Sequence, residues 1–258
     1  EANMMSMASG MALCGMRPII YTIAPFITIR CLEQIKIGVA YHKAPVVIVG
    51  TGSGLSYAEL GPTHHSLEDL AITSSIPDLN VLAPVDKVEL IFQLREAIES
   101  QIPTYIRIGK KGEPTLLNKN LSYGIGKANI IKEGKDILIL SIGPIINEAL
   151  KAAELLKKDG IDLCVASMGG IVPLDIEFLS DMKSRNFSYW ITLEEHGIIG
   201  GLGTSIIEWL SDSNNLNKIQ LKRLGIPKIF INKLGNQEYI RSQFRLDCEG
   251  IKQQILEL

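Results

Sequence analysis

Short apolar segments alternate with longer amphipathic segments along nearly the whole chain, and no other feature of the sequence limits the possible folds as much. The strands expected in the first part are IIYTIA (19–24), VVIVG (46–50), VLAPV (81–85) and TYIRI (104–108). The helices expected before and between these strands cover residues 2–15, 27–41, 67–75 and 88–100. Strands that are apolar throughout are typical of parallel sheets, because helices cover both faces of such a sheet. The alternation therefore predicts an α/β fold.

The same alternation restarts after the loop-like stretch GKKGEPTLLNKNLSYGIG (109–126). The strands expected there are 136–143, 162–168, 189–195 and 219–226, and the helices are 147–160, 175–183, 203–211 and a C-terminal tail. We therefore predict two consecutive open, mainly parallel sheets flanked by helices, in domains 1–115 and 122–258 with a linker near 112–124. A parallel sheet of this kind normally opens with a strand, so we expect the first domain to lack its first strand.

Composition excludes several classes of partner. The chain has 258 residues, 46% of them hydrophobic and 21% charged, and a net charge of −2, which favours neither nucleic acid nor an anionic membrane as a ligand. The four cysteines are far apart, which favours a reduced, cytoplasmic location. The segment from Met4 to Ile29 carries one charge, Arg17, but its glycines and prolines argue against a membrane span or a signal peptide. A buried helix followed by a buried strand is the better interpretation.

A glycine-rich run, GTGSG (50–54), precedes the segment ELGPTHHSLED (59–69). No helix opening follows the glycines, so the run does not fit a dinucleotide-binding fingerprint and predicts a loop with close backbone approach. Ser66 and Asp69 have the spacing of a capping box for the next helix. His64 and His65 lie where an open α/β sheet places ligands, and imidazoles there can relay protons or donate hydrogen bonds. A zinc site fits less well, because no partner stands at ligand spacing.

Several segments together resemble the transketolase family. EANMMSMASGMAL, IYTIAPF, RCLEQI, GPTHHSLED and PDLNVLAPVD are similar to its pyrimidine-binding domain. DILILSIG, IVPLD, TLEEHGIIGGLG and LGIPKIF are similar to its C-terminal domain. The resemblance covers nearly the whole chain and implies thiamine diphosphate as the cofactor, with its pyrimidine half bound here.

The resemblance also implies roles for individual residues. Glu1 matches the glutamate that hydrogen-bonds N1′ of the aminopyrimidine, and burial in an apolar pocket would raise its pKa. Phe26 matches the aromatic that stacks on the pyrimidine, although ordinary core packing explains it equally well without the resemblance. Ile29 stands where a second aromatic is common and keeps the pocket apolar. His64 matches the histidine that faces the reacting carbonyl and the substrate hydroxyls, while His65 stands where many members have glutamine.

Two basic positions and two departures bear on the substrate. Lys110 and Arg107 match residues that hold the phosphate of a sugar phosphate, although both also fit solvated surface cations. Leu60 replaces an aspartate that reads a ketose hydroxyl, and Gly52 replaces a histidine, so the donor is expected to be a deoxy sugar, another altered sugar or an acid such as pyruvate. We interpret His196 as structural or as part of a subunit interface.

A GDG motif, which in this family holds the metal for the diphosphate, is absent from the sequence. The resemblance therefore implies the second subunit of a split transketolase, which moves a two-carbon ketol unit between sugars or sugar phosphates. An N-terminal partner subunit would supply the diphosphate and Mg²⁺ sites in an α2β2 heterotetramer, and no metal site is expected in this chain. Alternatives are an activity like deoxyxylulose-phosphate synthase, one like the β subunit of a 2-oxo acid dehydrogenase E1, or a non-catalytic interaction subunit. GPTHH fits the transketolase side better than the E1 side.

Overall fold

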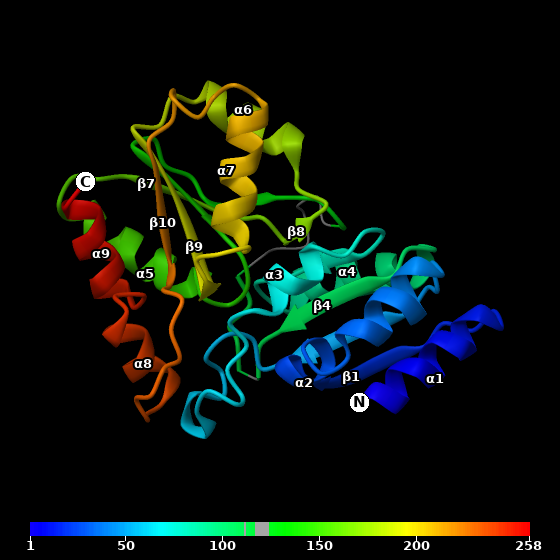
Figure 1. The fold of residues 1–258 in the computed structure, drawn as a ribbon. Helices are drawn as coiled ribbons and strands as arrows, with labels where there is room; N and C mark the ends of the chain where they lie inside the picture. The colour runs from blue at the N-terminus through cyan, green and yellow to red at the C-terminus, as the bar shows by residue number, and fades with distance from the viewer. Residues whose placement is uncertain (111, 117–123) are drawn as a thin grey trace.

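The computed structural model describes residues 1–110, 112–116 and 124–258, and within them the chain forms two five-stranded sheets that lie side by side (Figure 1). We refer to residues 1–116 as the first half and to residues 124–258 as the second half. The first sheet has the order β1-β2-β4-β3-β8 and the second has the order β10-β9-β6-β7-β5. Most neighbouring strands are parallel, which confirms the predicted fold class. The predicted linker near 112–124 includes residues 117–123, which lie outside the described residues.

The strands follow the apolar segments of the sequence closely. The strands of the first sheet are β1 (Ile19–Ile23), β2 (Val47–Thr51), β3 (Asn80–Leu82), β4 (Thr104–Ile108) and β8 (Gly170–Val172). The strands of the second sheet are β5 (Asn129–Lys132), β6 (Ile137–Ser141), β7 (Leu163–Ser167), β9 (Tyr189–Gly197) and β10 (Leu221–Ile226). In β6, Leu138 and Leu140 belong to one core cluster, whereas Ile137 and Ile139 belong to another. A strand buried on both faces is apolar along most of its length, which explains the long apolar runs.

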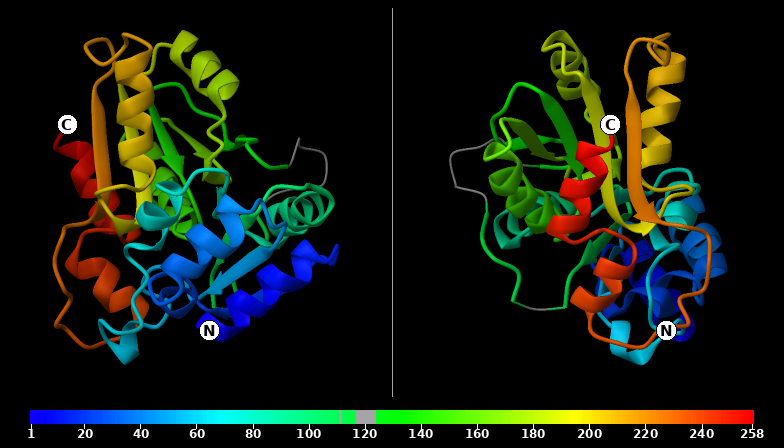
Figure 2. Two further views of the ribbon diagram at one scale, coloured as in Figure 1. Left: turned by 45° about the vertical axis from the view of Figure 1, so that its right-hand side comes forward. Right: turned by 90° about the vertical axis from the view of Figure 1, so that its left-hand side faces the viewer.

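Helices cover both faces of the second sheet (Figure 2). The helices of the first half are α1 (Ala2–Leu13), α2 (Ala24–Thr28), the π-helix η1 (Gln34–Tyr41), the 3₁₀-helix η2 (Ala58–Leu60), α3 (Asp69–Ser74) and α4 (Lys87–Glu99). Those of the second half are α5 (Ile146–Lys157), α6 (Ile176–Ser184), α7 (Leu202–Asp212), α8 (Gln237–Gln243) and α9 (Cys248–Leu256). α5 buries Ile146, Ala149 and Leu156, spaced so that they share one face of the helix. α5 and α9 lie on one side of the second sheet, and α7 lies on the other (Figure 2).

The second half also completes the sheet of the first half. Strand β8 pairs antiparallel with β3, with Val172 opposite Val81. Beside this strand, the Gln93 side chain donates a hydrogen bond to the Gly169 carbonyl at 2.9 Å, and the Ser167 hydroxyl donates to the carboxyl of Glu89 at 3.0 Å. The two halves therefore share strand pairing and buried polar contacts.

The first helix is less buried than the sequence indicates. α1 buries Met5, Ala8 and Ala12, but Met7 and Leu13 on its other side are 60% and 57% exposed. The expectation of a buried helix followed by a buried strand is therefore wrong for one face, and β1 likewise exposes alternate side chains. Among the described residues, no helix has the length and apolar character needed to cross a bilayer.

Two other local expectations differ from the structure. The helix expected over 27–41 is divided into α2 and the π-helix η1. The hydroxyl of Ser9 in α1 donates a hydrogen bond to the carbonyl of Gly38 in η1. The β-branched residues of this segment are weak α-helix formers, which favours a departure from regular geometry. The antiparallel edge strands β5 and β8 have no counterpart among the predicted strands, because segments of four and three residues are too short to carry a periodic signal.

Candidate functional site

Residues from three neighbouring parallel strands meet at the carboxyl end of the first sheet. Phe26 lies in α2, directly after β1, and Lys110 lies just after β4. Tyr57 and His64 lie in the loop that connects β2 to α3. Since β1, β2 and β4 are adjacent in the sheet, these segments come together at the edge where open α/β sheets bind ligands.

Glu1 reaches the same edge from the start of α1. Its carboxylate accepts hydrogen bonds from Arg30 at 2.6 Å and, more weakly, from the hydroxyl of Thr22 in β1 at 3.5 Å. The side chain of Glu1 is 23% exposed. The hydrogen bond from Arg30 holds the pKa of Glu1 below its usual value, so the expected raised pKa is wrong for this chain.

A chain of ring and cation contacts leads from Glu1 to His64. The guanidinium of Arg30 lies over the ring of Phe26, 4.6 Å from its centroid. The Phe26 ring meets the His64 imidazole edge to face, with centroids 5.2 Å apart. Nδ1 of His64 lies 2.9 Å from the hydroxyl of Thr63. The structure therefore brings Glu1, Phe26 and His64 together, connected through Arg30.

Tyr57 and Lys110 extend this cluster on its other side. The Tyr57 ring lies 6.5 Å from the His64 ring, and the ammonium group of Lys110 lies over Tyr57 at 4.9 Å. We call Glu1, Phe26, Arg30, Tyr57, His64 and Lys110 the candidate site. Sequence reasoning missed Arg30 and Tyr57. Arg30 follows Phe26 by four residues, a helical spacing that could have indicated the contact, whereas nothing local indicated Tyr57.

Arg107 and His65 are buried away from the candidate site. Arg107 is 4% exposed and donates hydrogen bonds to the main-chain oxygens of Ser66 at 3.3 Å and Glu195 at 2.5 Å. His65 is also 4% exposed, with Nε2 3.4 Å from the Ala58 carbonyl, and burial lowers its pKa. Neither placement fits the expected contact with a substrate, because both side chains are turned into the protein.

The expected capping box is also not formed. α3 begins at Asp69 with Glu68 at the capping position and no side-chain cap. The carboxylate of Asp69 instead accepts a hydrogen bond from the Tyr105 hydroxyl at 2.7 Å and lies 3.6 Å from Nε of Arg107. Burial, more than the contact with Asp69, raises the pKa of Tyr105 well above its usual value. Asp69 therefore connects α3 to β4 in the interior.

Of the other positions singled out from the sequence, Gly52 and Leu60 lie in the segment between β2 and α3, and Ile29 follows α2. Leu60 ends η2 and is 53% exposed, and Ile29 follows α2 and is 52% exposed. Gly52 has φ +80, and a Cβ there would lie 2.1 Å from Cε2 of Tyr57. Only glycine therefore lets the Tyr57 ring pack against the backbone at this point, which supports the predicted close approach.

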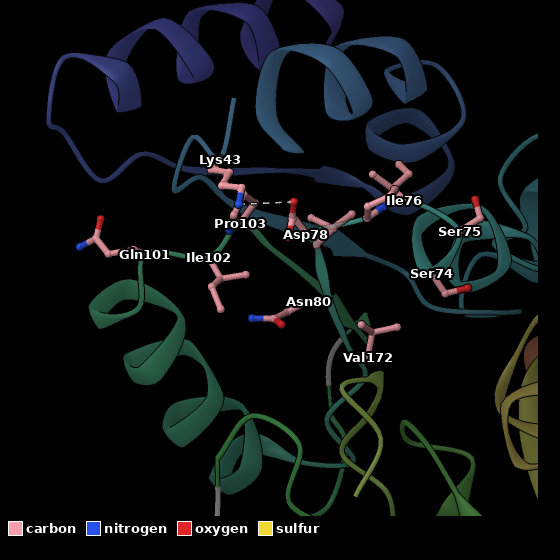
Figure 3. Close-up of a pocket in the computed structure, with 12 residues that line it drawn as sticks. Lys43, Ser74, Ser75, Ile76, Asp78, Asn80, Gln101, Ile102, Pro103 and Val172 are labelled. Carbon is pink, nitrogen blue, oxygen red and sulfur yellow. Dashed lines mark ion pairs between the residues drawn. The ribbon is translucent and has the colours of Figure 1, made fainter. Parts of the chain in front are cut away.

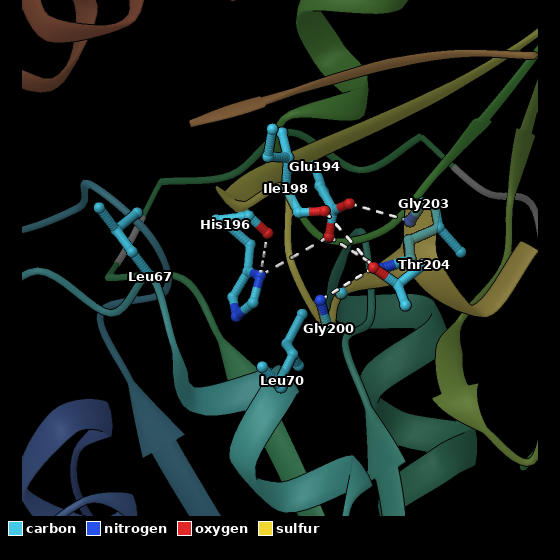
Figure 4. Close-up of polar contacts among 12 residues, drawn as sticks. Leu67, Leu70, Glu194, His196, Ile198, Gly200, Gly203 and Thr204 are labelled. Atoms are coloured by element: carbon cyan, nitrogen blue, oxygen red, sulfur yellow. Dashed lines mark hydrogen bonds and ion pairs between the residues drawn. The ribbon is translucent and has the colours of Figure 1, made fainter. Parts of the chain in front are cut away.

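His196 lies deep between the two halves. It is completely buried, with Nε2 4.0 Å from Asp69 and Nδ1 3.7 Å from Glu194. Burial lowers the pKa of His196 to about 4 and raises that of Glu194 to about 7. The carboxyl of Glu194 accepts hydrogen bonds from the main-chain N–H groups of Leu202 and Gly203 at the start of α7 (Figure 4). These contacts support a structural role for His196.

A hollow of about 650 Å³ lies at the opposite edge of the first sheet (Figure 3). Asn80 and Pro103, which line it, stand at the amino ends of β3 and β4. Its ion pair, Lys43 with Asp78 at 3.8 Å, is 71% and 57% exposed and contributes little. Because ligands of open α/β sheets bind at the carboxyl ends, this hollow is a weaker candidate than the cluster around His64.

Comparison with known proteins finds relatives of both halves of the chain. Residues 1–113 match the family described as transketolase, pyrimidine binding domain, and residues 126–251 match transketolase, C-terminal domain. A putative transketolase C-terminal section from Methanocaldococcus jannaschii is 35% identical over 259 residues, covering 100% of this chain and 80% of that protein. One subunit of the apulose-4-phosphate transketolase from Phocaeicola vulgatus is 32% identical, covering 100% of this chain and 81% of that subunit. A solved split-gene transketolase, an inactive beta4 tetramer, has a TM-score of 0.89 at 30% identity, covering 100% of this chain and 81% of that one.

Proposed function

We propose that this chain, which belongs to the transketolase family, supplies the pyrimidine side of a thiamine diphosphate site that is completed by a partner subunit. The chain is a subunit of a split transketolase-like transferase that moves a two-carbon ketol unit. The observation that carries the proposal is the connected series Glu1–Arg30–Phe26–His64 at the carboxyl ends of the strands.

The donor set of the candidate site fits the aminopyrimidine ring. Glu1 offers a carboxylate oxygen, Phe26 an aromatic face and His64 an imidazole next to that face. Within the described part of the chain, Oε1 of Glu1 accepts only the long contact from Thr22, so it is available to a ring nitrogen while Oε2 stays with Arg30. When bound, thiamine diphosphate supplies the nucleophilic carbon of ketol transfer. His64 then donates a hydrogen bond to the substrate carbonyl oxygen as negative charge develops there.

The partner follows from what the candidate site lacks. No group of three or more metal-ligating acidic, histidine or cysteine side chains occurs among the residues that the structure describes, whereas a diphosphate with Mg²⁺ needs oxygen ligands. Large apolar side chains are exposed on α1, on β1 and just after α1, among them Met7, Leu13, Met16 and Tyr21. Exposed apolar surface of this kind is typical of a protein interface. We therefore assign this face to the diphosphate-binding subunit, in an α2β2 assembly.

The substrate is a sugar or, more specifically, a sugar phosphate. Lys110 is exposed at the edge of the candidate site and is held near Tyr57, where its ammonium group can meet an anionic end of the substrate. Leu60, on the same loop as His64, offers no hydrogen-bonding group to a donor hydroxyl. A donor without a hydroxyl at this position, such as a deoxy sugar or pyruvate, is therefore the second candidate. The activity would then resemble that of deoxyxylulose-phosphate synthase.

The test is co-expression with a candidate diphosphate-binding subunit, followed by titration of each chain and of the complex with thiamine diphosphate and Mg²⁺. We expect tight binding by the complex and none by either chain alone. In the complex, His64→Asn should lower kcat/KM by roughly 100-fold while cofactor binding is retained, because it removes stabilisation of developing charge. Phe26→Ala should instead weaken cofactor binding.

Two results would contradict the proposal. One is tight binding of thiamine diphosphate by this chain alone, since the complete site would then lie within it. The other is full ketol transfer by a complex that carries Glu1→Ala, since the chain would then act as a non-catalytic interaction subunit. Glu257→Ala, which removes an exposed carboxylate paired with Arg245 in the second half, is the matched control.

A further inference from the structure

The loop that carries Tyr57 and His64 is closed at its base. The main-chain N–H of Ser66 donates to the carbonyl of Gly54 at 2.9 Å, and these two residues form an isolated antiparallel bridge. We call Gly54, Leu55 and Ser66 the neck of the loop. Both site residues lie between the two sides of the neck, so the geometry of the neck determines where their rings stand.

One residue of the second half holds both sides of this neck. The carboxylate of Glu195, in β9, accepts a hydrogen bond from the main-chain N–H of Leu55 at 2.6 Å. The main-chain oxygen of Glu195 accepts from Arg107 at 2.5 Å, and the same guanidinium nitrogen donates to the Ser66 oxygen at 3.3 Å. Glu195 is 6% exposed and Arg107 is 4% exposed, so water competes little for these contacts.

Glu195 is itself held firmly in place. Gln237 donates to its Oε1 at 2.8 Å, and Arg241 pairs with its Oε2. On the neck side, a Cβ at Gly54 would lie 2.5 Å from the main-chain oxygen of Glu195, and Gly54 has φ +58. A glycine is therefore required for strand β9 to approach the loop this closely.

The residues on either side of Glu195 serve other contacts. Glu194 caps the start of α7 through Leu202 and Gly203, and His196 packs between Glu194 and Asp69. Side chains alternate between the two faces of a strand, so of these three neighbours it is Glu195 that is directed at the neck. Of the three carboxyl and imidazole side chains, only that of Glu195 contacts the neck, while Gln237 and Arg241 hold it from the second half.

We infer that Glu195 is a positioning residue, through which the second half of the chain fixes the loop that presents Tyr57 and His64. This inference rests on the proposed function of His64, and it extends that function to a part of the chain outside the candidate site. Displacement of a reacting group by about 1 Å can cost roughly 100-fold in rate, so anchoring of the neck affects turnover more than folding.

The test compares Glu195→Gln with Glu257→Gln, a matched change in an exposed carboxylate that also pairs with an arginine. The glutamine in Glu195→Gln would keep the shape of the side chain but lose its charge and one acceptor oxygen. In the isolated chain, we expect amide hydrogen exchange over residues 54–66 to be about tenfold faster in Glu195→Gln, with β2, β6 and β9 unchanged. Gln237→Ala, which removes one donor to the same carboxylate, should give a smaller increase in the same segment.

In the complex with the partner subunit, Glu195→Gln should lower kcat roughly tenfold while KM stays within about twofold. Unchanged exchange over 54–66, or faster exchange to the same extent throughout both sheets, would overturn the inference. Exchange is measured without cofactor or partner, so a failure of the proposed function would leave the exchange result standing. A normal kcat in a variant whose loop exchanges faster would show that anchoring of the neck does not affect turnover, and would overturn the role of Glu195 as a positioning residue.

Discussion

At the scale of single residues, burial separates side chains that look alike in the sequence. His64 and His65 are neighbours, yet His64 contacts Phe26 at the candidate site while His65 is enclosed near Ala58. Arg107 and Lys110 lie three positions apart, yet Arg107 joins the two halves while Lys110 reaches solvent. A similar separation occurs among carboxyl groups, where a cation lowers the pKa of Glu1 and burial raises that of Glu89.

The buried carboxyl of Glu89 predicts a pH dependence of stability. Burial raises its pKa from 4.5 to about 7, although the Val85 N–H and the Ser167 hydroxyl donate hydrogen bonds to it. Between these two values the unfolded chain has released the proton that the folded chain still holds, so rising pH favours unfolding. Glu89→Gln removes this group, and its free energy of unfolding relative to the wild type should rise by roughly 2–3 kcal/mol between about pH 5 and pH 8.

Chemical denaturation at several pH values measures this difference. Glu133→Gln, an exposed carboxyl paired with Arg185, is the control and should show little change. A difference for Glu89→Gln that stays constant from acid to neutral pH would mean that the carboxyl is already ionised in the folded protein.

At the scale of elements, two glycines near the end of α1 differ in backbone conformation. Gly10 lies within α1, whereas Gly15 follows the helix with φ +90, and a Cβ at either position would meet no atom of the described residues within 4 Å. Side-chain space therefore does not distinguish them. Alanine at position 10 would favour the helix, whereas any side chain at position 15 would be strained by the positive φ.

Gly10→Ala should raise the free energy of unfolding of the isolated chain by about 0.5–1 kcal/mol, because alanine restricts the unfolded chain and favours the helix. Gly15→Ala should lower it by roughly 1 kcal/mol, because of its positive φ. Thermal and urea unfolding of both variants provide the measurement. Equal effects of the two substitutions would contradict the assigned boundary of α1.

At the scale of the whole molecule, the two halves are joined by more than the connecting chain. β8 completes the first sheet, Glu89 contacts the end of β7, Gln93 contacts the turn after it, and Arg107 contacts Glu195. Buried polar contacts of this kind are lost together when the halves separate, because each would leave an unpaired group in the interior.

We therefore expect both halves to unfold in one transition. Trp190 and Trp209 are stacked in the second half and report on it by fluorescence, whereas buried Cys31 reports on the first half through thiol labelling resolved by peptide mass. The two urea midpoints should coincide within experimental error. Exposure of Cys31 at a clearly lower urea concentration than the fluorescence change would show that the halves unfold separately.

The sequence by itself determined the fold class and the family. The apolar runs VVIVG (46–50) and ILIL (137–140) indicated strands covered on both faces, and GPTHH with TLEEHGIIGGLG indicated the relatives that the comparisons confirm. Local periodicity carries the fold class, because it reflects each segment's own geometry, and the short motifs carry the family. Only the tertiary structure decided that Arg107 and His65 face inward, that Arg30 binds Glu1, and that Glu195 reaches Leu55. Such contacts join residues far apart in the chain, so the exposure of each side chain depends on how the two halves pack, which no local pattern records.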